Sequence, residues 1–221
     1  LISSHTTPAP PYLLLKPQIV KTYNTQNKQG IDAGGVSREW FAVLSRTLLA
    51  PETGLFTAIG DEGICQPSTN SVASTVPHLP AFKLTGRLVA KALIESQNLD
   101  IHFSRSFYKH ILGQPVTFAD LEATEPDFFK SMVAILEHPL EDLGLELTFS
   151  DEHRALGTTT VVDLVPGGHS LAVEDETKAL YARLLTEYRT TAAIRDQTKA
   201  FLTGFYSVLD RSLVSIFDVH Q

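Results

Sequence analysis

The sequence of 221 residues contains a single cysteine, Cys65, and no long apolar segment. One cysteine excludes an intrachain disulfide and a zinc site built from cysteines. No apolar run approaches the roughly 18 residues that a membrane-spanning helix needs. The eight histidines do not occur in a paired spacing such as His-Glu-x-x-His. We therefore expect no metal ion and no other cofactor.

The sequence also lacks runs of Lys and Arg, and its net charge is −7. Binding to nucleic acids and to anionic membranes depends on clustered basic residues, so neither is an expected partner. The apolar segment 12–15 is too short and too closely flanked by prolines to be a signal peptide. Together with the single cysteine, this favours an intracellular protein, in the cytoplasm, the nucleus or both.

A glycine-rich turn followed by an amphipathic segment is the most distinctive stretch of the chain. Glycines 30, 34 and 35 precede apolar residues at helical spacing, which predicts a helix over 34–49 with Trp40 in the core. No apolar strand precedes the glycines and no Lys-Ser/Thr pair follows them, so a phosphate-binding loop is disfavoured. The apolar residues of this face are Val36, Trp40, Val43, Leu44 and Leu48.

The remaining sequence predicts an α+β fold in which helices predominate. Prolines make residues 1–22 an irregular arm, and residues 60–77 form a polar loop. A second long helix begins at Pro80 and presents Phe82, Gly86, Val89, Ala90 and Leu93 on one face. Shorter elements follow between 114 and 173: a helix over 127–137 and strands over 146–149, 160–164 and 171–173. Long helices then resume, including one over 194–209.

Cys65 is a poor candidate for a nucleophile. Its neighbours Asp61 and Glu62 would raise the pKa of the thiol, and no histidine lies nearby in the sequence to act as a base. Asp, Glu and His residues elsewhere show no spacing typical of a self-contained hydrolase, which we rank last among the possible functions.

The glycine-rich stretch Gly30-x-Asp32-x-Gly34-Gly35-Val36-x-Arg38-Glu39-Trp40-Phe41 resembles the opening signature of the HECT family of ubiquitin ligases. Further blocks that resemble the family follow in the family's order. They include Pro51-x-x-Gly54-Leu55-Phe56, His78-Leu79-x-x-Phe82-x-x-x-Gly86-Arg87, Phe107-Tyr108-Lys109, Asp120-Leu121-Glu122 and Gln197-x-x-Ala200-Phe201-x-x-Gly204-Phe205.

The resemblance implies the amino-terminal lobe of a HECT domain, with an arm over 1–22. It further implies a large helical subdomain formed by 23–113 and 174–221, and a small subdomain over 114–173 that docks a ubiquitin-conjugating enzyme. The expected partners are this enzyme, ubiquitin as its thioester, and a protein substrate bound through unknown regions. The family's cysteine-bearing second lobe is expected beyond Gln221, so no catalytic residue is expected here. A start at Leu1 instead of methionine also suggests a fragment.

Docking contacts of the family correspond by resemblance to Met132, Leu136 and Leu156. For Met132 and Leu136, which share a helix face, ordinary core packing is an equally good interpretation. Leu156 stands where the family often has phenylalanine, so an aromatic anchor is missing. Glu52 and Thr53 replace the tyrosine of members that bind a second ubiquitin, and we do not assign that site. The alternative function is a noncatalytic interaction module descended from this lobe.

Overall fold

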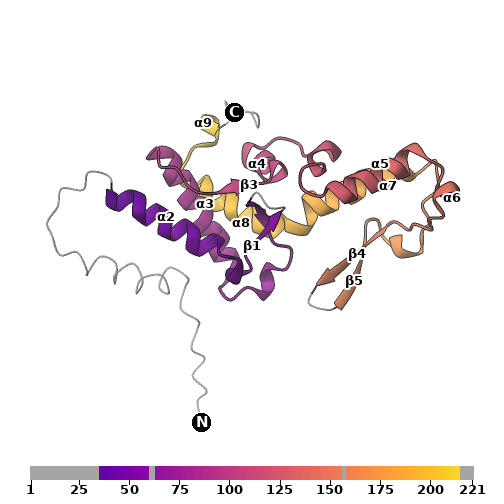
Figure 1. Cartoon of the computed structure of the whole chain (residues 1–221), viewed down its shortest axis with the longest axis horizontal. Helices are drawn as coiled ribbons and strands as arrows, with labels where there is room; N and C mark the ends of the chain where they lie inside the picture. The colour runs from indigo at the N-terminus through magenta and orange to yellow at the C-terminus, as the bar shows by residue number, and fades with distance from the viewer. Residues whose placement is uncertain (1–34, 60–62, 156–157, 215–221) are drawn as a thin grey trace, which may run out of the picture. The chain divides into compact units, whose positions relative to one another are not determined.

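The structure is a computed structural model that describes residues 35–59, 63–155 and 158–214. Helices predominate in these residues, and the strands are short (Figure 1). The helices are α2 (Gly35–Leu49), α3 (His78–Ile94), α4 (Arg105–Leu112), α5 (Pro126–Glu137), α6 (Leu140–Leu143), α7 (Lys178–Thr190), α8 (Arg195–Phe205) and α9 (Arg211–Val214), and the 3₁₀ turns are η1 (Pro51–Thr53), η2 (Ser71–Ala73), η3 (Phe118–Leu121), η4 (Gly168–Ser170) and η5 (Ala192–Ile194). The strands are β1 (Phe56–Ile59), β2 (Ile64–Pro67), β3 (His102–Phe103), β4 (Ser150–Ala155) and β5 (Thr158–Asp163). The predicted α+β class with mostly helical structure is confirmed.

The chain divides into two compact units. Of the described residues, 35–57, 70–101 and 196–214 belong to the first unit, and 58–59, 63–69, 102–155 and 158–195 belong to the second. In this division α4 and α7 belong to the same unit as the described residues between 114 and 173. The arm over 1–22 lies outside the described residues, and the assignment of a large and a small subdomain stays a prediction from the resemblance.

Helix α2 packs on α3 in the first unit, but through a slightly different face from the predicted one. Phe41, Leu44 and Leu48 are buried, whereas Trp40 is half-buried and packs on the edge of this cluster. Val36, at the start of the helix, is 43% exposed. One residue corresponds to about 100° of helix rotation, so burial of Phe41 turns Trp40 toward the edge. The prediction that Trp40 lies in the core was wrong, because Phe41 takes the buried position and Trp40 lies at the edge of the cluster.

Helices α3 and α8 approach each other through a reciprocal glycine contact. A Cβ atom on Gly86 of α3 would overlap the backbone carbonyl of Phe201 in α8, and one on Gly204 of α8 would overlap the carbonyl of Lys83 in α3. The predicted burial of Phe82, Gly86 and Ala90 is confirmed. Leu93, predicted on the same face, is 58% exposed because α3 extends beyond this contact.

Four of the described strands, β1, β2, β3 and β4, were not predicted from the sequence. β2 lies within the expected polar loop and pairs in parallel with β3, with Cys65 opposite Phe103. β4 has the polar sequence Ser-Asp-Glu-His-Arg-Ala, which lacks an alternating apolar pattern, and it pairs antiparallel with β5. The predicted strands over 146–149 and 171–173 meet only in an isolated bridge between Thr148 and Ala172.

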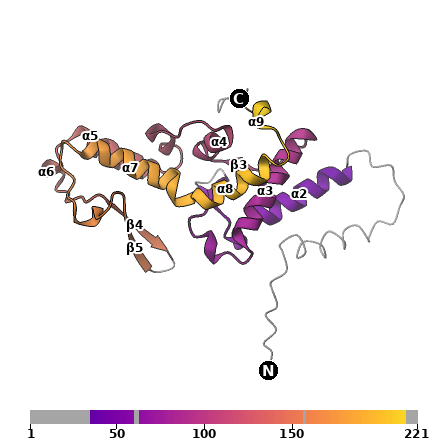
Figure 2. The same ribbon diagram turned by 180° about the vertical axis from the view of Figure 1, so that it is seen from behind.

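Helices α5 and α7 lie side by side and form the centre of the second unit (Figures 1 and 2). They are antiparallel, because Lys178 at the start of α7 contacts the residue after α5 and Arg189 at its end contacts the residue before α5. The buried core around them consists of Met132, Ile135, Leu140, Phe149, Val173, Tyr181, Ala182 and Leu185. The second unit therefore has an apolar core of its own.

We predict that Gly86→Ala destabilises the first unit, because the added methyl group meets a backbone carbonyl that cannot rotate away. The expected loss of unfolding free energy is about 3 kcal/mol, measured by chemical denaturation. Gly35→Ala is the matched control, since a Cβ there meets nothing within 4 Å. Equal stabilities of the two variants would contradict the close approach of α3 and α8.

Candidate functional site

Helix α5 carries two of the three predicted docking residues. The helix begins at Pro126, a favourable first position, and ends before His138 and Pro139. Met132 is 2% exposed and belongs to the core of the second unit. Leu136, one turn later, is only partly buried and packs on the edge of that core. The structure thus gives Met132 a packing role and leaves part of Leu136 at the surface.

The third residue, Leu156, lies outside the described residues, between strands β4 and β5. These strands form an antiparallel hairpin in a continuous register from Ser150 opposite Asp163 to Ala155 opposite Thr158. Phe149 holds the base of the hairpin: its amide donates to Leu171 at 3.0 Å, and its carbonyl accepts from Leu164 at 2.8 Å. Helix α5 therefore carries two of the three predicted residues, and the third follows β4 in the sequence.

Arg189 joins the hairpin to α5. Its guanidinium donates from Nη2 and Nε to the two carboxylate oxygens of Asp151, at 2.8 and 3.1 Å. Nη1 donates to Glu125 Oε2 at 3.0 Å, and the guanidinium carbon lies 4.0 Å from the ring centre of Phe128. Burial lowers the pKa of Arg189, but hydrogen bonds and charges of Asp151 and Glu125 outweigh it and leave the pKa raised.

Sequence reasoning missed Arg189 entirely. Its partners Asp151 and Glu125 lie 38 and 64 residues away in the chain. No local spacing reports a contact over such separations, so no signal in a single sequence could have revealed it. The local sequence around Arg189, within a predicted helical region, does not predict an ion pair.

Lys178 holds the opposite end of the α5–α7 pair. Its Nζ donates to the carbonyl of His138 at 2.9 Å and to Asp175 Oδ1 at 3.1 Å. The same carboxylate oxygen accepts from the amide of Leu140 at 3.2 Å, at the start of α6. These bonds fix the turn that follows Leu136, so α7 restrains both ends of α5.

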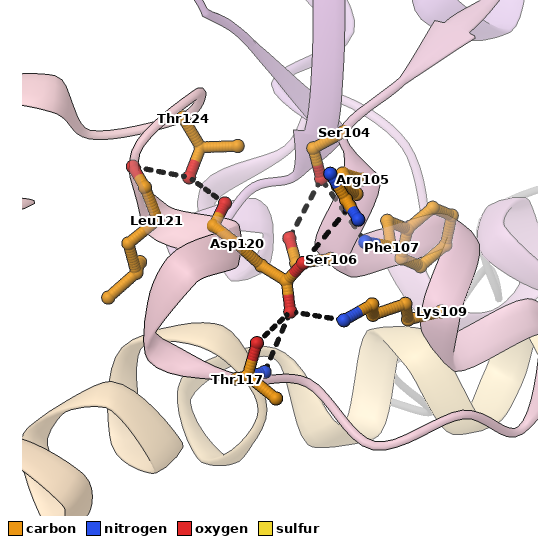
Figure 3. A network of polar contacts seen from close by, with 9 residues as sticks. All are labelled: Ser104, Arg105, Ser106, Phe107, Lys109, Thr117, Asp120, Leu121 and Thr124. Atoms are coloured by element: carbon orange, nitrogen blue, oxygen red, sulfur yellow. Dashed lines mark hydrogen bonds and ion pairs between the residues drawn. The ribbon is translucent and has the colours of Figure 1, made fainter. Parts of the chain in front are cut away.

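A second polar network surrounds Asp120, which is 2% exposed, in the second unit (Figure 3). Its Oδ2 accepts from Lys109 Nζ at 2.7 Å and from the amide of Thr117 at 2.7 Å, and Arg105 Nε lies 3.2 Å from Oδ1. Burial raises the pKa of Asp120, but the hydrogen bonds from Lys109 and Thr117 together lower it by more. The pKa of Asp120 therefore lies below its ordinary value. The network joins α4 to η3 and is structural.

Cys65 lies half-buried in strand β2, and burial raises the pKa of its thiol to about 11. The expected effect of Asp61 and Glu62 on this pKa is not tested, because both residues lie outside the described part of the chain. At neutral pH the thiol is protonated and therefore weakly nucleophilic.

The part of the chain that the structure describes lacks both a cluster of metal ligands and a membrane-spanning helix. It contains no group of three or more His, Cys, Asp or Glu side chains that could hold a metal ion. None of its helices combines the length and the apolar character needed to cross a bilayer.

These elements define the chain as a predominantly helical α+β domain with two units. The family model described as HECT-domain (ubiquitin-transferase) matches residues 42–221. The chain belongs to this family, as the resemblance of its motifs predicted.

Individual relatives support the same conclusion. The chain is 46% identical over 200 residues to the E3 ubiquitin-protein ligase UPL2 of Arabidopsis thaliana, with 87% of this chain and 5% of the relative covered. It is 43% identical over 197 residues to the E3 ubiquitin-protein ligase TOM1-like of Neurospora crassa, with 89% and 5% covered. It is 41% identical over 212 residues to the E3 ubiquitin-protein ligase HACE1 of Danio rerio, with 92% and 23% covered. The chain therefore spans less than a quarter of the length of these relatives.

We predict that Asp120→Asn lowers the unfolding free energy by about 3 kcal/mol at pH 7, because Lys109 loses its buried partner. The pKa of Asp120 is lower in the folded state than the value of about 3.9 in an unfolded chain. Its contribution is therefore present above the unfolded pKa and is lost as the pH falls through the folded pKa. Denaturation at several pH values should show the difference between variant and wild type shrinking below about pH 4. Glu122→Gln, at an exposed neighbouring position, is the control and should change little at any pH.

We also predict that iodoacetamide alkylates Cys65 at pH 7.5 roughly 100-fold more slowly in the folded chain than in urea, as the raised pKa lowers the thiolate fraction. Mass spectrometry of timed samples measures both rates. Fast alkylation of the folded chain would show an activated thiol and would reopen a catalytic role for Cys65.

Proposed function

We propose that this chain is the amino-terminal lobe of a HECT-type ubiquitin ligase and that it recruits a ubiquitin-conjugating enzyme. The observation that carries the proposal is the family match over residues 42–221, together with relatives named as ubiquitin-protein ligases. The protonated thiol of Cys65 supports a recruiting role for this part of the protein, because thiol exchange needs a thiolate.

In the proposed mechanism, the thiolate of a cysteine elsewhere in the ligase attacks the thioester carbonyl of the docked conjugating enzyme. A new thioester forms, and the cysteine of the conjugating enzyme leaves as a thiolate. A substrate lysine amine then attacks the second thioester: an amide bond forms, the ligase cysteine leaves as a thiolate, and the amine nitrogen loses a proton to solvent. The lobe contributes proximity, because holding one thioester close to the acceptor makes the exchange effectively intramolecular.

The proposed docking face comprises the exposed part of Leu136 and the Leu156 region of the hairpin. Met132 supports Leu136 from the core beneath it and does not present its own side chain, since it is 2% exposed. Phe118, Phe128 and Leu136 are among the half-buried residues around this core. A side chain that is partly exposed and backed by a packed core is suited to contact a partner without rearrangement.

The charge of the second unit supports a partner with a basic docking surface. Residues 102–195 contain 15 Asp and Glu residues against 8 Lys and Arg, so they carry the whole net charge of −7. Charges of opposite sign on the two partners accelerate association and make it sensitive to salt. We therefore expect conjugating enzymes with a basic docking face to bind best.

The test is a calorimetric titration of the chain against a panel of ubiquitin-conjugating enzymes. We expect at least one enzyme to bind, and Leu136→Asp and Leu156→Asp to weaken that binding at least tenfold, a loss of about 1.4 kcal/mol. Leu93→Asp is the matched control, because this leucine is 58% exposed on α3 in the first unit. Near-ultraviolet circular dichroism checks that each variant remains folded.

Two results would contradict the proposal. Absence of binding at several hundred micromolar, far above the roughly 1 µM that corresponds to about −8 kcal/mol, would favour the noncatalytic interaction module. An equal loss in Leu93→Asp would place the docking face outside α5 and the hairpin.

A further inference from the structure

We propose that Arg189 is a positioning residue that sets the direction of the β4–β5 hairpin relative to α5. The inference rests on the proposed docking function, because the hairpin and α5 carry the residues assigned to the conjugating enzyme. Arg189 itself is not assigned to the docking face: its guanidinium is engaged by Asp151, Glu125 and Phe128.

The geometry of the contact with Asp151 restricts rotation as well as distance. Two parallel N–H groups of one planar guanidinium meet two oxygens of one carboxylate, and this fork fixes the relative orientation of both planes. Asp151 is the second residue of β4 and lies opposite Val162 of β5. Any rotation of the hairpin about its base therefore breaks at least one of these hydrogen bonds.

The same guanidinium is anchored on α5 by two independent contacts. Glu125 precedes the first residue of α5, and Phe128 lies in its first turn. The ring of Phe128 faces the cation at 4.0 Å, a distance at which cation–π attraction is significant. One side chain thus links the end of α7, the start of α5 and the second residue of β4.

The described backbone hydrogen bonds that attach the hairpin to the rest of the unit lie at its base, around Phe149. Glu152, Thr160 and Val161 are exposed, with Val161 52% accessible. A two-stranded hairpin is only marginally stable by itself, so the attachments at its base contribute to its direction.

The first experiment measures the hairpin directly in the 221-residue chain. Spin labels at Thr160→Cys on β5 and Lys130→Cys on α5, in a Cys65→Ser background, report the distance distribution between the two elements. We expect a narrow distribution with Arg189 present and a broad or shifted one in Arg189→Gln. Arg189→Lys keeps the charge but loses the fork, and should lie between them. Arg183→Gln is the matched control, since Arg183 is exposed on the same helix.

Arg189→Gln leaves the Asp151 carboxylate buried without its Arg189 partner, which also lowers the stability of the folded chain. A change in hairpin direction must therefore be separated from this loss of stability. The double variant Arg189→Gln/Asp151→Asn removes both charges and should regain much of the thermal midpoint. A positioning role requires the distribution to stay broad in this double variant. A role in stability alone requires the distribution to narrow as the midpoint recovers.

The second experiment repeats the titration with the conjugating enzyme that binds the unmodified chain best. We expect Arg189→Gln to weaken binding roughly tenfold, since a docking face that is no longer preorganised must be ordered on binding. We expect Arg183→Gln to leave the affinity unchanged. A narrow distance distribution in folded Arg189→Gln, or unchanged affinity in it, would overturn the inference and leave the proposed function standing. A broad distribution combined with a wild-type chain that binds no conjugating enzyme would support the positioning role and overturn the proposed function.

Discussion

The antiparallel pairing of α5 and α7 is the constraint on which the second unit depends. Along this pair, residue numbers rise on one helix as they fall on the other, from Arg189 beside Glu125 to Lys178 beside His138. Tyr181, Ala182 and Leu185 of α7 pack into the same core as Met132 and Ile135 of α5. The apolar core holds the helices together, and the charged residues at the two ends prevent them from sliding.

Two charged side chains of this unit, Arg189 and Asp120, link elements that are separate in the sequence. Removing a charge from water is costly, so a buried ion pair adds little net stability compared with apolar packing. Arg189 and Asp120 each contact more than one element, and each bond has a preferred direction. Such networks select one arrangement among several that would bury the same apolar area. This matters for the β4–β5 hairpin, in which Val161 is exposed.

The proposed function is consistent with the charges and the thiol of the described chain. The single cysteine is protonated at neutral pH, and its strand β2 is paired with β3. Negative charge is concentrated in residues 102–195, around the elements to which docking is assigned. A lobe that binds and positions a reactive partner needs shape and charge, and it does not need a nucleophile of its own.

The sequence by itself determined the family, the helical class and most helix positions. These depend on local patterns, such as the apolar spacing in α2 and α3 and in the segment 127–137 that forms most of α5. It also placed Met132 and Leu136 on one helix, but left open which of them faces the core.

Tertiary structure alone decided that Met132 is buried, that Phe41 replaces Trp40 inside, and that the polar segment 150–155 is a strand. It also brought Arg189 to Asp151 and Glu125. The physical reason is that local patterns are set by neighbours within a few residues, whereas burial, strand pairing and ion pairing depend on partners that only the folded chain brings together.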